Sequence, residues 1–241
     1  MKTGKLYGLG VGPGDPELMT IKAVRCIEEC EVIAAPGVRM EESVAYQIAR
    51  GACPGLDEKE LVPVAMPMTK DPEILRKSHE AAADQVEKYL RQGKNVAFLT
   101  LGDTTIYSTY LYLHRRILEK GYEASLVSGV TSFCAAAARV CTGLAEGSEM
   151  LHIIPATFQT EKLDEILCQP GTKVLMKSGK HMGRVREALM TCGQQVIMVE
   201  NCGMEQEKVY WSAEEIPRNA GYYSLIIVKP YPQQAGKENM V

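Results

Sequence analysis

Four glycines stand at alternate positions of residues 8–14, in the segment GLGVGPG, and Asp15 follows them directly. Glycines at the end of a strand permit a sharp turn or let a ligand approach the backbone closely. The spacing excludes a dinucleotide fingerprint, because Pro13 or Asp15 stands where the third glycine would be needed. A P-loop is excluded as well, since no Gly-Lys-Ser/Thr follows. Two interpretations remain open: a ligand-binding loop, and a tight turn capped by Asp15.

A second glycine–acid pair, Gly102 and Asp103, follows an apolar run and precedes a helical pattern. Open α/β sheets bind ligands in loops after the carboxyl ends of their strands. The carboxylate of Asp103 can accept hydrogen bonds from a ribose or an amino group, and it can also cap the helix. The pair therefore predicts a second ligand loop, a helix cap, or both.

Two later segments can also meet a ligand. In SGVTSFCAAAARV, residues 128–140, small side chains permit close approach of a sheet or of a flat ligand. Thr131 and Ser132 can cap the helix there or offer hydroxyl and N–H groups. Residues 173–186 hold five Lys or Arg and no acid. Lys177 and Lys180 lie in a strand-to-helix loop of this basic run, which faces either an anionic substrate or solvent.

The elements that must position these residues alternate between strand and helix. Apolar runs predict strands at 5–11, 31–35, 95–101, 123–127, 150–154, 173–176, 195–199, 207–210 and 223–228. Amphipathic spacing predicts helices from Asp15 onward and at 41–50, 72–91, 106–119, 131–140, 161–167 and 181–192. This alternation is typical of an α/β fold. We predict two α/β lobes, 1–124 and 125–230, a frayed tail at 231–241, and a small-molecule site in the cleft between the lobes.

Composition narrows the class of protein. The 241 residues carry 27 Lys and Arg against 30 Asp and Glu, a net charge of −3, so a basic field for nucleic acid over the whole surface is excluded. No apolar stretch approaches the ~18 residues of a membrane helix, and no secretory signal is expected. The eight cysteines form no CxxC and the four histidines no ligand cluster. We therefore expect a cytoplasmic protein with no bound metal, no membrane contact and no nucleic-acid partner.

Taken in order, these segments resemble the tetrapyrrole (corrin/porphyrin) methylase family, the class III methyltransferases. The matching pieces are GLGVGPGDPELMTIKA from residue 8, GD-x-x-I-Y at 102–107, GVTSFCAAAA from 129 and GYYSLIIVK at 221–229. Within the family, YSTYLYLHRR, SGVTSFCAAAA and ENCG at 200–203 look most like the methylases that act on C-20 of precorrin-2 or cobalt-factor II.

The resemblance implies a two-lobed class III methyltransferase fold, a homodimer, and S-adenosylmethionine as the methyl donor. It implies a donor pocket lined by Gly102, Asp103, Thr104, Ile106, Tyr107, Thr131, Ser132 and Met176. Pro13, Gly14 and Asp15 would face the cleft where the tetrapyrrole lies. Thr104 and Ser128 stand where the family usually has proline, so both loops are expected to be less rigid.

The implied reaction is methyl transfer to the C-20 meso carbon of precorrin-2 or of its cobalt form, in cobalamin biosynthesis. Any cobalt would belong to the substrate. The substrate carboxylates require cations, for which Lys177 and Lys180 are the candidates and Arg39 a weaker one. Tyr222 and Asp15 are the candidates for the base that removes the meso proton. Two alternatives stay open: methylation at another ring position, and a non-catalytic nucleotide-binding module.

Overall fold

The computed structural model describes residues 3–67, 69, 71–156 and 162–230, and it divides into two compact units, Met1–Ser132 and Phe133–Val241. The sequence places the division after residue 124. Strand β5 (Ala124–Val127) pairs with β1 (Leu6–Gly10), and this pairing keeps residues 125–132 with the first unit. The predicted tail at 231–241 lies outside the described residues.

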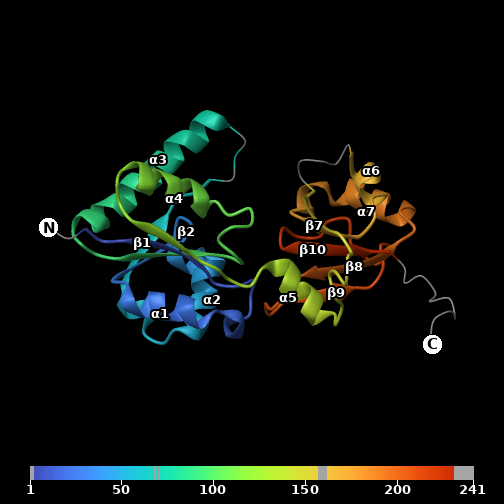
Figure 1. The fold of residues 1–241 in the computed structure, drawn as a ribbon, viewed down its shortest axis with the longest axis horizontal. Helices are drawn as coiled ribbons and strands as arrows, with labels where there is room; N and C mark the ends of the chain where they lie inside the picture. The colour runs from blue at the N-terminus through green and yellow to red at the C-terminus, as the bar shows by residue number, and fades with distance from the viewer. Residues whose placement is uncertain (1–2, 68, 70, 157–161, 231–241) are drawn as a thin grey trace. The chain divides into compact units, whose positions relative to one another are not determined.

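The first unit is built on a parallel sheet in the order β3-β2-β4-β1-β5. Its other strands are β2 (Val32–Pro36), β3 (Glu60–Val64) and β4 (Val96–Thr100). Helices α1 (Ile21–Glu29) and α2 (Val44–Ala52) cover one face, and α3 (Pro72–Arg91) and α4 (Tyr110–Glu119) cover the other (Figure 1). All five residues of β4 are buried, as expected of a central strand with helices on both sides.

Two elements of this unit differ from the sequence prediction. Strand β3 is not predicted because Pro63 interrupts its short apolar run, but proline is tolerated at the sheet edge that β3 occupies. Helix α4 begins at Tyr110 rather than at residue 106. Tyr107 has a left-handed φ of 51°, which a right-handed helix cannot include, so residues 101–109 remain a loop.

The second unit has a mixed sheet in the order β6-β7-β10-β8-β9. The strands are β6 (Leu151–Pro155), β7 (Thr172–Met176), β8 (Gln195–Glu200), β9 (Lys208–Tyr210) and β10 (Ser224–Lys229). Helices α6 (Leu163–Leu167) and α7 (Met182–Thr191) cover one face, and α5 (Ser132–Arg139) lies on the opposite side (Figure 1). Because β10 runs antiparallel to β7 and β8, the carboxyl ends of β7 and β8 lie next to the start of β10. This end of the strands, marked by Met176, Glu200 and Ser224, is the shared edge of the second sheet.

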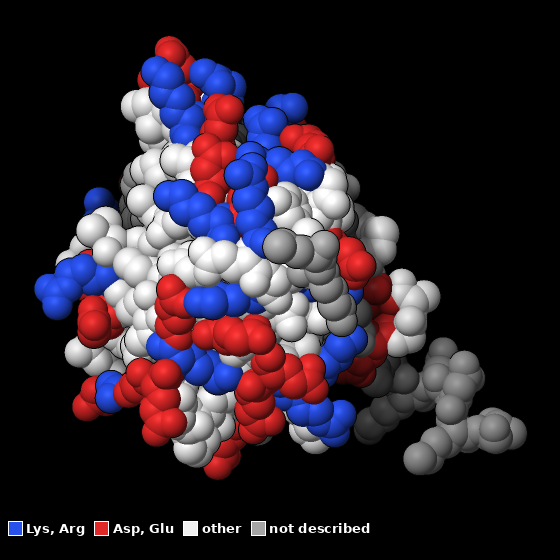
Figure 2. Space-filling model, turned by 90° about the vertical axis from the view of Figure 1, so that its left-hand side faces the viewer, with Lys and Arg blue, Asp and Glu red and all other residues white. Residues whose placement is uncertain are grey.

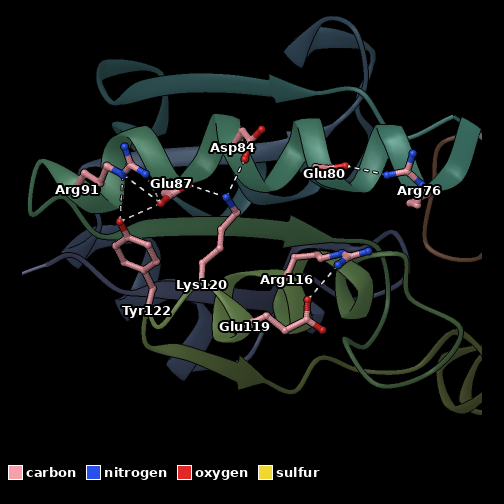
Figure 3. A network of polar contacts seen from close by, with 9 residues as sticks. All are labelled: Arg76, Glu80, Asp84, Glu87, Arg91, Arg116, Glu119, Lys120 and Tyr122. Atoms are coloured by element: carbon pink, nitrogen blue, oxygen red, sulfur yellow. Dashed lines mark hydrogen bonds and ion pairs between the residues drawn. The ribbon is translucent and has the colours of Figure 1, made fainter.

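Charged residues tie α3 to α4 on the outer surface of the first unit. Glu87 of α3 accepts hydrogen bonds from Lys120 at 2.7 Å and from Arg91 at 2.7 Å (Figure 3). Lys120 also donates to Asp84 at 2.8 Å, and the Tyr122 hydroxyl donates to Glu87 at 3.2 Å. The side chain of Glu87 is only 11% exposed, so this network is partly shielded from water. Figure 2 shows one face of the molecule, on which cations and anions are intermixed.

Candidate functional site

Three loops meet at the carboxyl edge of the first sheet, one after each of β1, β4 and β5. Gly12 and Gly102 form an isolated antiparallel bridge, in which Gly102 N donates to Gly12 O at 2.7 Å and Gly12 N donates to Gly102 O at 3.2 Å. These bonds join the GPGD loop to the GD loop. The two glycine motifs that the sequence singles out are therefore one structure.

Glycine is required where the backbones of these loops touch. A Cβ on Gly129 would lie 2.2 Å from the carbonyl oxygen of Gly102, and a Cβ on Gly10 would lie 2.5 Å from the amide nitrogen of Gly129. Neither approach is possible for a larger residue without moving backbone. The absence of side chains at these positions is thus explained by close packing of the three loops.

Asp103 links the second loop to the third. Its Oδ2 accepts a hydrogen bond from Gly129 N at 2.9 Å, and its Oδ1 accepts from Thr105 N at 2.7 Å and from the Thr105 hydroxyl. Burial by itself would raise the pKa of Asp103, but the hydrogen bonds from Thr105 and Gly129 outweigh it and hold the pKa below its usual value. The carboxylate is therefore charged and already engaged on both oxygens.

Hydroxyl groups line the same junction. Thr104 is fully buried and its hydroxyl donates to Val127 O at 3.4 Å. The Thr20 hydroxyl donates to Ser128 O at 3.3 Å. Thr131 Oγ1 is buried and has no hydrogen-bond partner among the described residues. A buried hydroxyl without a partner is costly, so Thr131 has hydrogen-bonding capacity for a bound polar group.

The first loop has a structural role as well. Asp15 Oδ1 caps the short 3-10 helix Pro16–Leu18 by accepting from Glu17 N at 2.9 Å. Pro13 and Gly14 are buried, whereas Asp15 is half-buried. The capping role considered from sequence is present. Of the three residues expected to face a substrate, Asp15 is the one with side-chain surface to offer.

The shared edge of the second sheet gathers the other predicted residues. Met176 ends β7 and pairs with Leu225 of β10, so Lys177 lies beside the segment that carries Tyr222. Lys177 has a left-handed φ of 58°, and burial lowers its pKa. The rings of Tyr222 and Tyr223 meet edge to face at 5.3 Å between centroids. Burial, with Tyr223 nearby, raises the pKa of Tyr222, which is therefore protonated at neutral pH.

Most of the basic run has structural partners. Arg184 pairs with Asp164, and Arg186 donates to two carbonyl oxygens, Ile216 O at 3.0 Å and Glu214 O at 3.1 Å. Lys173 is 1% exposed and donates to Gln194 Oε1 at 3.1 Å. The side chain of Lys180 is outside the described part of the chain. Of the two lysines predicted to hold carboxylates, the structure describes Lys177 alone.

The predicted site residues thus form two groups, one in each unit. The first unit holds Pro13, Gly14, Asp15, Gly102, Asp103, Thr104, Ile106, Tyr107, Thr131 and Ser132, and the second holds Met176, Lys177 and Tyr222. Arg39 joins neither group, because its exposed side chain pairs with Glu41 at 3.7 Å and Glu42 at 4.0 Å.

Within the described residues, no group of three or more His, Cys, Asp or Glu is arranged to hold a metal ion. None of the described helices is long and apolar enough to cross a membrane.

Sequence reasoning missed one residue of the second group. Glu200, at the end of β8, accepts a hydrogen bond from Gly221 N at 2.6 Å. Its place in the segment ENCG marks a strand end, but nothing in the spacing connects it with a glycine 21 residues later.

Comparison with known proteins finds the same family that the sequence motifs resemble. The family model described as Tetrapyrrole (Corrin/Porphyrin) Methylases matches residues 5–217. The chain is 35% identical over 233 residues to the cobalamin biosynthesis protein CobIJ of Mycobacterium bovis; the match covers 93% of this chain and 46% of that protein, so the chain spans about half the length of this relative. It is 34% identical to a probable cobalt-precorrin-2 C(20)-methyltransferase of Methanocaldococcus jannaschii, covering 94% of this chain and 96% of that one.

Solved structures support the architecture. The cobalt precorrin-4 methyltransferase CbiF superposes with a TM-score of 0.72 at 20% identity, and the match covers 93% of this chain and 94% of that one. At this identity the likeness concerns the fold. It agrees with the predicted two-lobed α/β class III methyltransferase fold.

Proposed function

Since the chain belongs to the tetrapyrrole (corrin/porphyrin) methylase family, we propose that it transfers a methyl group from S-adenosylmethionine to the C-20 meso carbon of precorrin-2 or cobalt-precorrin-2. The proposal extends to a cytoplasmic homodimer that works in cobalamin biosynthesis. Both substrates are kept in the proposal, because the relatives matched over almost their whole length include a probable cobalt-precorrin-2 C(20)-methyltransferase and a precorrin-2 C(20)-methyltransferase.

The observation that carries the proposal is the three-loop junction of the first unit. Gly10, Gly102 and Gly129 bring main chain together without side chains, and Thr131 leaves a buried hydroxyl without a partner among the described residues. The unused hydroxyl offers a hydrogen-bond partner to a bound polar group beside this closely packed backbone. We assign the donor to this junction, with Asp103 holding it in shape.

S-adenosylmethionine, when bound, supplies a methyl group on a sulfonium that leaves readily. The methyl carbon–sulfur bond breaks as the meso carbon forms its new bond to that methyl, and the meso carbon then loses a proton. The protein need only hold the two carbons in line near contact distance and exclude water, which lowers the barrier by about 7–11 kcal/mol in favourable cases. We assign donor binding to the loop junction of the first unit, and we assign Lys177 and Tyr222 of the second unit to the tetrapyrrole.

Asp15 and Tyr222 are the two candidates for the group that accepts the meso proton, and their chemistry distinguishes them. Tyr222 is protonated at neutral pH because burial raises its pKa, so it donates a hydrogen bond and is poorly suited to accept the meso proton. The carboxylate of Asp15 is an acceptor-only group when ionised. We therefore assign the proton-accepting role to Asp15 and the donor role to Tyr222.

The test is transfer of label from methyl-labelled S-adenosylmethionine to precorrin-2 and to cobalt-precorrin-2 in parallel, followed by NMR of the product. The expected result is one labelled methyl at C-20 with at least one of the two substrates. Label at another ring carbon would show that the protein methylates that carbon and that C-20 is the wrong position. Binding of S-adenosylhomocysteine with no transfer to either tetrapyrrole would contradict catalysis and indicate a nucleotide-binding module.

A further inference from the structure

Gly221 lies between two loops at the shared edge of the second sheet. Its N–H donates to Glu200 Oε1 at 2.6 Å, and its carbonyl oxygen accepts from the Ser224 hydroxyl at 2.8 Å. Both polar groups of this one peptide position are therefore held by side chains. The turn that carries Tyr222 starts from a residue fixed on both sides.

The same residue meets the loop after β7. A Cβ on Gly179 would lie 2.9 Å from Gly221 O, so the two backbones are in direct contact. Gly179 lies two residues after Lys177, and Tyr222 directly follows Gly221. Any displacement of Gly221 thus changes the spacing between the two side chains assigned to the substrate.

Glu200 is itself held in place. The hydroxyl of Tyr210, on the neighbouring strand β9, donates to Glu200 Oε2 at 3.3 Å. Glu200 also lies opposite Ser224 in the register of β8 and β10, so the carboxylate, the serine and the glycine turn occupy one corner of the sheet. With one oxygen on Tyr210 and the other on Gly221, the carboxylate has a defined orientation.

We infer that Glu200 is a positioning residue of the proposed methyl transfer: it holds the turn that carries Tyr222 against the loop that carries Lys177. The inference rests on the function proposed above. Glu200 acts through Gly221 and need not touch the substrate. An acceptor oxygen at this position, rather than the negative charge, is what the turn requires.

Two substitutions separate these roles. Glu200→Gln keeps an oxygen that accepts from Gly221 N, whereas Glu200→Ala removes it. We expect kcat/KM for the tetrapyrrole substrate to fall on the order of 10- to 100-fold in Glu200→Ala, because small misplacements of reacting groups have effects of this size. Glu200→Gln should stay within about threefold of wild type, a difference below about 1 kcal/mol. Equal losses in both variants would overturn a positioning role.

Glu215→Ala is a matched control. Glu215 accepts a hydrogen bond from a backbone amide of the same unit, Trp211 N at 2.8 Å, but that amide does not belong to the shared edge. Loss of this contact should leave kcat/KM at the wild-type value. A loss equal to that of Glu200→Ala would mean that any such contact in the unit matters equally, and would contradict the inference.

Tyr210→Phe tests the same network if Glu200→Ala does not fold. It removes only the hydroxyl that orients Glu200, so a smaller decrease in kcat/KM is expected, at an unchanged melting temperature.

Hydrogen exchange of the Gly221 amide gives a readout that does not depend on turnover: protection should persist in Glu200→Gln and be lost in Glu200→Ala. Retained protection and full activity in Glu200→Ala would overturn the inference. If wild-type protein transfers no methyl group to either tetrapyrrole, the proposed function fails instead.

Discussion

The carboxylate of Asp103 accepts a hydrogen bond from the backbone N–H of Gly129, 2.9 Å away, and so joins the loop after β4 to the loop after β5. Strand β1 lies between those two strands, and its own loop is bonded to Gly102. One side chain therefore stabilises an arrangement of three loops. We therefore expect substitution of Asp103 to change ligand binding through the geometry of the loops.

Asp103→Asn should weaken binding of S-adenosylhomocysteine. Both Asp103 oxygens accept from N–H donors, so an asparagine must turn its NH₂ group toward one donor and leave that donor unsatisfied, at about 1–3 kcal/mol. Calorimetry should then show a decrease in affinity on the order of tenfold or more. Asp71→Asn is the control, because Asp71 also accepts from backbone amides but caps α3 away from the junction. Unchanged affinity in Asp103→Asn would contradict the assignment of the donor site.

Gly129→Ala should displace the loops themselves. The added Cβ would stand 2.2 Å from Gly102 O, so one backbone must move, with a loss of stability of about 1–3 kcal/mol and weaker S-adenosylhomocysteine binding. Gly183→Ala, in α7, meets no atom within 4 Å and should be neutral or more stable by about 1 kcal/mol. Thermal unfolding and calorimetry on both variants check the contrast. Equal behaviour of the two would show that the close contact at Gly129 is unimportant.

Lys177→Glu should raise KM for the tetrapyrrole and leave donor affinity unchanged, because it replaces the cation that we propose for the substrate carboxylates by an anion. An increase on the order of tenfold corresponds to one charge-assisted hydrogen bond. Burial lowers the pKa of Lys177, and only the protonated amine binds a carboxylate. The wild-type KM should therefore begin to rise at a pH below the usual pKa of lysine, as Lys177 loses its proton. Lys88→Glu, on the exposed face of α3, makes the same charge change as a control. A wild-type KM in Lys177→Glu would exclude this lysine from substrate binding.

Tyr222→Phe should slow methyl transfer in a single turnover, by about tenfold or more, since it removes one hydrogen-bond donor from the reacting group. The melting temperature should not change, because the ring packing on Tyr223 is kept. Tyr223→Phe is the matched control and should leave the rate near that of wild type. A normal single-turnover rate in Tyr222→Phe would remove this residue from the mechanism.

Glu87→Gln should lower stability at neutral pH on the order of 1–3 kcal/mol, because it removes the shielded negative charge and leaves only one acceptor oxygen for Lys120 and Arg91. Those two partners hold the pKa of Glu87 at about 2 in the folded protein, below its value in the unfolded chain. The unfolded chain therefore binds the proton more readily, and stability falls as pH falls.

Urea unfolding at several pH values checks this effect. The difference between wild type and Glu87→Gln should be constant above about pH 5 and should disappear as the pH falls from about 4.5 toward 2. Glu80→Gln is the control, because Glu80 and its partner Arg76 are both more than half exposed. That substitution should change stability by less than about 1 kcal/mol at any pH. A pH-independent difference for Glu87→Gln would contradict the depressed pKa.

Much of the architecture follows from local sequence. Helix α3 occupies residues 72–91 as predicted, because Asp71 caps it, Pro72 starts it, and its apolar residues recur at helical spacing. The glycine motifs correctly indicate loops at the ends of β1 and β4. Strand β3 and the start of α4 were predicted wrongly or not at all, since each depends on a sheet edge or a left-handed residue that periodicity does not reveal.

By itself, the sequence determined the family, the order of the elements and the identity of the loops that carry chemistry, because these depend on residue types close together in the chain. Only the tertiary structure decided that Asp103 binds Gly129, that Gly179 touches Gly221, and that Glu200 holds the turn before Tyr222. These contacts join residues 21 to 42 positions apart, and strand order and register alone bring them together. For the same reason, only the structure shows that Lys173, Arg184 and Arg186 of the basic run have structural partners.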